Sequence, residues 1–185
     1  LLTPQCLETQ VWDYNYRKET SLSPNPVTGI REDKEGNLWV GTIEGGLNKK
    51  AKDTDEFIHF TFDRTKETSI STNSINGLLI DSENHLWAYT WGTGINEIDL
   101  NIPNNQRFIR HTREDSLGLE GDFLSCASED PLNKGIWFGT TRGLHFYNKT
   151  NKHFTRVLFE QSDNEFEGNS SLLIDRQHRL WWGTS

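Results

Sequence analysis

The sequence predicts an all-β protein built as a β-propeller, because a strand–turn–strand unit recurs about every 47 residues. The repeat is marked by four tryptophans spaced by 48, 50 and 44 residues, namely Trp39, Trp87, Trp137 and Trp181. No segment shows apolar residues at the i, i+3, i+4, i+7 spacing of a helix, which argues against a strand–helix solenoid. We therefore expect about four blades of four antiparallel strands in these 185 residues.

Each unit contains four short apolar runs that are separated by turn residues. In the first unit, the predicted strands lie at about 27–32, 37–42, 46–50 and 57–62. A single strand at Val11–Tyr16 would precede this unit, and two strands would follow the third unit. The expected segments are a blade remnant at 1–20, three blades at about 21–68, 69–115 and 116–166, and half a blade at 167–185.

The turn between the first two strands of a unit carries its own signal. Three residues before the tryptophan stands a residue that tolerates a left-handed backbone, namely Gly36, Asn84 and His178. An aspartate three places earlier would cap the turn with a side-chain oxygen, at Asp33, Asp81 and Asp175. In the third copy Asp130 has the same role, but the turn is one residue longer and its glycine, Gly135, comes late. That turn should differ from the others.

One position in the first strand of each unit holds a small residue, namely Gly29, Gly77, Cys126 and Ser171. First strands crowd around the axis of a propeller, so large side chains would clash there. Cys126 is therefore expected to pack in the interior. The second cysteine, Cys6, lies 120 positions away, and the two form neither a disulfide framework nor a zinc pattern.

Charge and composition exclude several functions. The net charge of −8 argues against a nucleic-acid partner and against adsorption to an anionic membrane. No apolar run approaches the length of a membrane span, and Leu1–Thr3 shows no signal peptide. The chain contains no Met, which suggests an excised or processed piece. The six histidines lack ligand spacing and no phosphate loop appears, so we expect no metal and no cofactor.

Candidate ligand-binding residues lie in loops where the copies differ. Trp91 would stack on a sugar ring, Arg142 would hold a carboxylate or sulfate, and Glu44 occupies the corresponding loop of the first unit. One loop position before each unit is polar in all four copies and would ring the mouth of the channel, namely Asn25, Asn73, Asp122 and Glu167. The alternatives are a solvated rim residue or blade packing for the first group and local turn capping for the second.

The segment 27–48, VTGIREDKEGNLWVGTIEGGLN, closely resembles the two-component regulator propeller repeat. The resemblance covers roughly residues 11–185, although the second copy departs from the repeat at Ala88 and Tyr89. Such repeats build periplasmic sensor domains of hybrid two-component systems in Bacteroides-type bacteria. These propellers usually have seven blades, which need roughly 330 residues. The resemblance therefore implies a fragment of a larger propeller, with closure into four blades through the N-terminal 16 residues as the alternative.

The resemblance also implies the function. This segment would sense a ligand, with an oligosaccharide as the expected class, and the histidine kinase domain would lie elsewhere in the full protein. No catalytic activity is expected in the segment, no direct membrane contact is expected, and a homodimer or packing against further blades is expected. The alternatives are a polysaccharide-active lyase or glycosidase and a protein-interaction scaffold.

Overall fold

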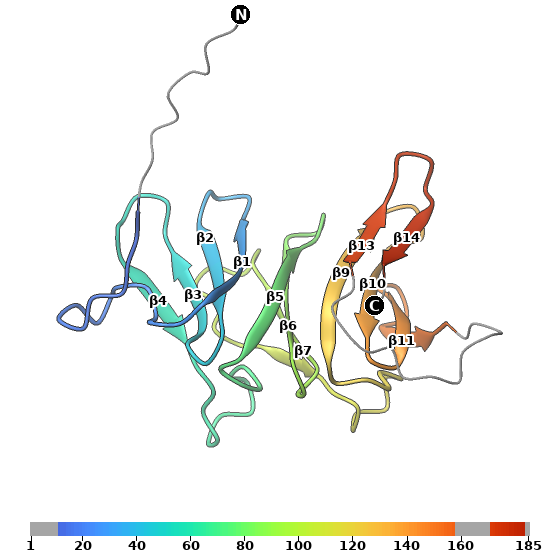
Figure 1. Cartoon of the computed structure of the whole chain (residues 1–185), viewed down its shortest axis with the longest axis horizontal. Helices are drawn as coiled ribbons and strands as arrows, with labels where there is room; N and C mark the ends of the chain where they lie inside the picture. Colours follow the sequence, from blue (N-terminus) through green and yellow to red (C-terminus); the bar gives the residue numbers. More distant parts are fainter. Residues whose placement is uncertain (1–10, 158–170, 184–185) are drawn as a thin grey trace, which may run out of the picture.

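The computed structural model describes residues 11–157 and 171–183, which form three four-stranded antiparallel sheets and one two-stranded sheet (Figure 1). The first blade contains β1 (Val27–Glu32), β2 (Leu38–Thr42), β3 (Gly46–Lys50) and β4 (Phe57–Phe60). The second contains β5 (Ile75–Ile80), β6 (His85–Thr90), β7 (Ile95–Asp99) and β8 (Ile109–His111). The third contains β9 (Leu124–Asp130), β10 (Gly135–Thr140), β11 (Gly143–Asn148) and β12 (His153–Arg156). The last two strands are β13 (Ser171–Ile174) and β14 (Leu180–Gly183).

The strands of each blade follow one another in sequence order, which confirms the predicted propeller-type sheets. The first strands of successive blades are neighbours, β1 beside β5, β5 beside β9, and β9 beside β13. The first blade and the β13–β14 pair lie at opposite ends of an open arc (Figure 1). Each junction between two blades therefore buries one face of each sheet.

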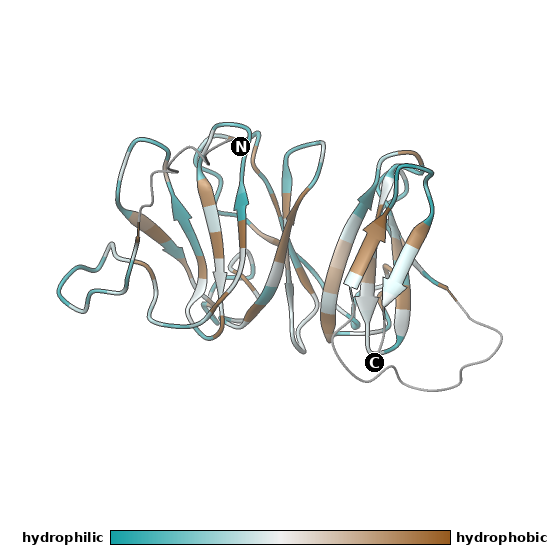
Figure 2. Cartoon of the chain, turned by 45° about the horizontal axis from the view of Figure 1, so that its top comes forward, coloured by the Kyte–Doolittle hydropathy of each residue, from teal (hydrophilic) through white to brown (hydrophobic). Residues whose placement is uncertain are grey.

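Aromatic residues fill these junctions. Trp39 is 1% exposed and stacks on Phe60, with ring centroids 5.5 Å apart, in the core between the first and second blades. Trp87 is also 1% exposed and packs against His111 and Tyr147 between the second and third blades. Apolar residues (brown) alternate with paler and polar residues along the strands, whereas the connecting loops are mostly polar or pale (Figure 2). Burial of these aromatic faces is the main force that holds neighbouring blades together.

The turn between the first two strands is fixed by one carboxylate. Asp33 Oδ1 accepts hydrogen bonds from the backbone N–H groups of Glu35 and Asn37, as predicted for a turn cap. Its Oδ2 accepts a hydrogen bond of 2.8 Å from the indole Nε1 of Trp39, which the sequence did not reveal. Burial raises the pKa of the Asp33 carboxyl, but the hydrogen bonds from Asn37 and Trp39 outweigh burial and hold the pKa below its usual range.

The same aspartate–tryptophan bond recurs in the other units, at 3.0 Å for Asp81–Trp87, 3.1 Å for Asp130–Trp137 and 2.7 Å for Asp175–Trp181. The left-handed positions are confirmed as well, with φ of 86°, 65° and 59° at Gly36, Asn84 and His178. In the longer third turn the left-handed residue is Lys134, with φ of 51°. This confirms that the third turn differs.

The small residues at the shared position of the first strands have two causes rather than one. A Cβ on Gly29 would stand 3.2 Å from the backbone nitrogen of Leu78 in the next blade, so crowding between blades applies there. A Cβ on Gly77 would instead collide with the hydroxyl of Tyr89 in its own blade. Cys126 is buried, as expected, and Cys6 lies outside the described residues.

The expected strand at Val11–Tyr16 is wrong, because residues 11–26 form only turns and irregular backbone. Asn15 and Lys18 accept turn hydrogen bonds from Lys18 and Ser21, which bend the chain away from a strand path. Four-blade closure would pair the segment that precedes Val11 with β14, and that segment lies outside the described residues.

Candidate functional site

The loops at one end of the blades form a groove between the second and third blades. Its volume is about 350 Å³, and it is lined by Trp91, Arg113, Glu120, Gly121, Asp122, Phe123, Thr141 and Arg142. The residues come from the β6–β7 loop, the β8–β9 connection and the β10–β11 loop. The groove thus brings together three of the predicted ligand-binding residues, Trp91, Asp122 and Arg142.

The loop after β6 holds Trp91 at the surface, where 68% of the residue is exposed. Its backbone forms an isolated antiparallel bridge with Phe123, which is itself 47% exposed. The next residue, Gly92, adopts φ of 111° and donates its N–H to the carbonyl of Asp122 at 2.9 Å. A side chain at this φ would be strained, so the glycine allows the sharp bend that leaves the indole facing solvent.

Asp122 caps a loop with its side chain and also lines the groove. Its Oδ1 accepts a hydrogen bond of 3.0 Å from the backbone N–H of Arg113, which closes the loop after β8. Its carbonyl accepts from Gly92 and, at 3.3 Å, from Gly94 in the preceding blade. One residue therefore ties the β8–β9 connection to the β6–β7 loop, and both of these segments line the groove.

Charged side chains of both signs stand in the groove. Arg113 and Arg142 contribute two positive charges, and Glu120 and Asp122 contribute two negative charges. Glu120 Oε2 also forms an ion pair with Arg156 Nη1 at 3.1 Å. The backbone N–H of Arg142 donates to Thr140 Oγ1 at 3.0 Å, which fixes the start of its loop.

The other predicted residues lie away from this groove. Asn73 Oδ1 accepts a hydrogen bond of 2.7 Å from the backbone N–H of Phe62, so this side chain caps the loop after β4. Asn25 precedes β1, and Glu44 occupies the β2–β3 loop with a left-handed φ of 66°. Glu167 lies outside the described residues. The predicted polar ring is thus described only in part, and Asn73 and Asp122 act there as turn caps.

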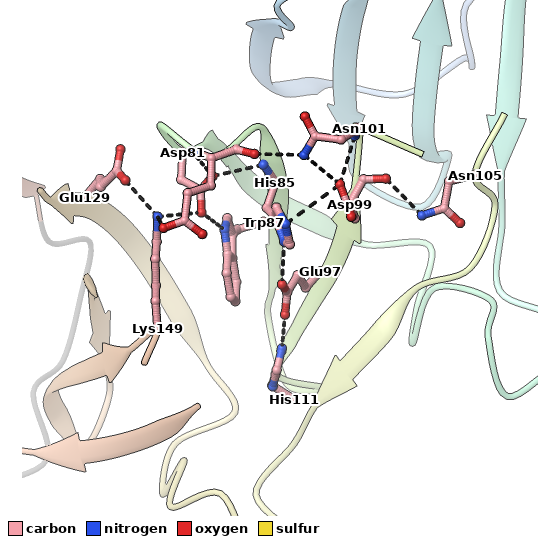
Figure 3. Close-up of polar contacts among 11 residues, drawn as sticks. Asp81, His85, Trp87, Glu97, Asp99, Asn101, Asn105, His111, Glu129 and Lys149 are labelled. Atoms are coloured by element: carbon pink, nitrogen blue, oxygen red, sulfur yellow. Dashed lines mark hydrogen bonds and ion pairs between the residues drawn. The ribbon is translucent and has the colours of Figure 1, made fainter. Parts of the chain in front are cut away.

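A buried polar network spans the second blade (Figure 3). Glu97 lies between two histidines, with Oε1 2.7 Å from His85 Nδ1 and Oε2 2.8 Å from His111 Nε2. Burial raises the pKa of the Glu97 carboxyl, but the hydrogen bonds from the two histidines outweigh burial and lower the pKa from 4.5 to about 2. The hydrogen bond to Glu97 raises the pKa of His85 above its ordinary value of 6.5.

Sequence reasoning missed this network because it treated the histidines as scattered. A signal did exist in the repeat. The first unit has Asn37, Lys49 and Phe60 at the positions where the second unit has His85, Glu97 and His111. All three positions differ between the two units and lie on neighbouring strands, which indicates that the three side chains of the second unit contact one another.

A second polar contact joins the turns of the second and third blades (Figure 3). Lys149 Nζ lies 2.9 Å from Asp81 Oδ2 and 2.8 Å from Glu129 Oε1. Glu129 also accepts hydrogen bonds from the backbone and hydroxyl of Ser82. Burial lowers the pKa of the Lys149 ammonium, but its bonds to Glu129 and Asp81 outweigh burial and raise it. The contact lies at the opposite end of the blades from the groove.

Within residues 11–157 and 171–183, no group of three His, Cys, Asp or Glu side chains could hold a metal ion. In the same residues, no helix is long and apolar enough to cross a membrane.

Comparisons with known proteins agree with the propeller-type sheets of this fold. The profile described as "two component regulator propeller" matches residues 21–44. A search of curated proteins found no significant match.

Two similar solved structures come from B. thetaiotaomicron. One is described as the extracellular domain of the hybrid two-component system BT3049, with 18% identity and a TM-score of 0.77. The other is described as the extracellular domain of the one-component system BT4673, with 25% identity and a TM-score of 0.71. The alignments cover 94% of this chain in both cases, but only 23% and 24% of those chains. This chain therefore spans about a quarter of their length.

A third structure, of a streptogramin B lyase, is 12% identical, with a TM-score of 0.60. That alignment covers 84% of this chain and 47% of the lyase. At this identity the likeness shows the fold alone.

Proposed function

We propose that this chain is a segment of the extracytoplasmic domain of a hybrid two-component sensor histidine kinase. The proposal rests on the two-component regulator propeller repeat, which lies among propeller blades. The similar structures described as extracellular domains support this assignment and a periplasmic location. The signal that we propose is an oligosaccharide. Catalysis of phosphoryl transfer would belong to a kinase domain outside these residues.

The observation that carries the ligand class is the convergence of Trp91, Asp122 and Arg142 on one groove. An exposed indole offers a flat apolar surface, and the flanking charged groups offer hydrogen-bond donors and acceptors. Sugars present both kinds of surface, since an apolar ring face is surrounded by hydroxyl groups. The groove thus fits a sugar better than it fits a purely apolar or purely ionic ligand.

Packing against a further blade or a second copy is part of the same proposal. Trp181 is 55% exposed and Leu173 is 60% exposed, whereas Trp87 at the equivalent position of the second blade is covered by the third blade. An aromatic core residue left open at the end of the arc predicts that another apolar face covers it. This supports a propeller with more blades than the described strands provide.

Isothermal calorimetry of the intact protein against a panel of plant and host oligosaccharides tests the function. Saturable heat with one glycan class, and unchanged glycan recovered afterwards, is the result expected of a sensor. Heat that continues until the glycan is consumed would contradict the sensor function and would favour the alternative, a lyase or glycosidase. Absence of glycan binding, with binding to a protein partner instead, would favour the interaction scaffold.

A further inference from the structure

We propose that the groove between the second and third blades binds an uncharged pyranose unit, and that it discriminates against uronate and sulfated sugars. This inference rests on the proposed function, because it names the class of glycan that the sensor would receive. Under this proposal Arg142 donates hydrogen bonds to sugar hydroxyls, whereas the sequence alone suggested that it binds a carboxylate or sulfate.

The first argument is the exposed aromatic surface. Trp91 and Phe123 lie on the two sides of an isolated backbone bridge, so their relative position is fixed by main-chain contacts. Both side chains are largely exposed although each would gain from burial. A ring whose apolar face covers the indole would supply that burial without any rearrangement of the loop.

The second argument is the charge balance of the groove. Two arginines, Arg113 and Arg142, and two carboxylates, Glu120 and Asp122, line the groove, and the Glu120 carboxylate is paired with Arg156 beside it. A sugar carboxylate or sulfate placed there would meet two like charges as well as two opposite ones, and like-charge contacts oppose binding. Sugar hydroxyls have no such conflict, because each hydroxyl donates to a carboxylate and accepts from a guanidinium.

The third argument is that the polar groups are held in place before a ligand arrives. Asp122 is fixed by the backbone N–H of Arg113, and Glu120 by its ion pair with Arg156. Fixed groups lose little conformational freedom on binding, which favours recognition of one hydroxyl pattern. The volume of about 350 Å³ lies near the lower end of the range for small-molecule sites, about 300–1,000 Å³, and suits a short part of a glycan chain.

The walls of the groove belong to different blades, with Trp91 in the second and Arg142 in the third. A sugar that contacts both loops would therefore bridge the junction between these blades. Binding at this place would tie the two blades together, which is a direct way for a ligand to restrict their relative movement.

The test compares matched glycans in calorimetry of the intact protein. Each pair has the same linkage and length, and differs only in the C6 group, for example α-1,4-linked galactose oligomers against α-1,4-linked oligogalacturonates. We expect a neutral member of a pair to bind and its uronate to bind at least about tenfold more weakly. Trp91→Ala should weaken the neutral glycan by about tenfold or more, as for truncation of an aromatic hot spot. The matched control is Tyr16→Ala, an aromatic that is 73% exposed outside the groove and should leave affinity unchanged.

The outcomes separate this inference from the proposed function. Tighter binding of the uronate, lost in Trp91→Ala, would overturn the preference for uncharged sugars while the sensor stands. Neutral glycan binding that survives Trp91→Ala would overturn the location of the site and also leave the sensor standing. Failure of every glycan to bind an intact, folded protein would contradict both.

Discussion

Single side chains in this protein do several tasks at once, and the repeated aspartate is the plainest case. In each turn one carboxylate satisfies backbone N–H groups and also receives the indole N–H of the core tryptophan. A buried tryptophan needs a partner for its N–H, and the turn cap supplies one. The aspartate thus couples the shape of an exposed turn to the orientation of a ring inside the blade junction.

The Glu97 network makes stability depend on pH in two directions. The pKa of Glu97 is lowered from 4.5 to about 2, so its contribution is present above pH 4.5 and is lost as pH falls toward 2. The pKa of His85 is raised, so its contribution is present below pH 6.5 and is lost as pH rises through the raised value. The network therefore stabilises the fold most between pH 4.5 and pH 6.5.

We predict that Glu97→Gln lowers the free energy of unfolding by about 2 kcal/mol near pH 6, because His85 and His111 both lose their carboxylate partner. Urea unfolding of the intact protein from pH 4.5 to pH 8 measures the change. The difference between wild type and variant should shrink as pH rises above the raised pKa of His85. A constant difference across that range would contradict the assigned charge of His85.

Among the elements, the turns between the first two strands show how backbone geometry selects residue types. Three of them place Gly36, Asn84 or His178 in the left-handed region, where these residue types have a low cost. The longer third turn places Lys134 there, although lysine has no side-chain feature that favours this conformation. The third hairpin thus carries local strain that the others avoid.

Replacement of that lysine should relieve the strain. We predict that Lys134→Gly raises the free energy of unfolding by about 0.5–1 kcal/mol, since glycine adopts positive φ without a steric penalty. Thermal unfolding monitored by circular dichroism measures the effect. The converse change, Gly36→Ala, forces a Cβ into a φ of 86° and should destabilise the protein. A lower stability of Lys134→Gly would show that the strain is absent.

For the whole molecule, the junctions between blades differ in the contacts that hold neighbouring sheets together. The junction of the second and third blades has the aromatic core around Trp87, the buried contacts of Lys149 at one end and the loop groove at the other. In the second blade Leu100 takes the position of Lys149, and at the junction of the first and second blades a lysine from another position, Lys34, donates a hydrogen bond of 3.0 Å to the carbonyl of Ser82. The two junctions therefore differ in electrostatic strength.

This difference is testable with a matched pair of variants. Lys149→Met should cost about 3 kcal/mol, because it leaves Asp81 and Glu129 without their shared cation in a largely buried place. Lys34→Met should cost less than about 0.5 kcal/mol, because the hydrogen bond it removes is exposed. Urea unfolding of both variants measures the comparison, and equal losses would contradict the assigned role of Lys149.

The sequence by itself determined the blade pattern, the turn positions and which loops share one end of the blades. These features are local, since a strand, a hairpin turn and a capping aspartate depend on residues only a few positions apart. The repeat made them visible four times. The strand expected at Val11–Tyr16 failed for the same reason, because a first partial unit has no complete hairpin to set its register.

Only the tertiary structure decided which loop residues meet. Trp91 and Arg142 belong to different blades, and their convergence depends on how two sheets pack rather than on spacing along the chain. The balance of arginines and carboxylates in the groove, and the shared carboxylate of Glu97 between two histidines, arise in the same way. Contacts between blades join residues that one sequence cannot pair, because side-chain packing across the junction fixes them and the repeat period does not.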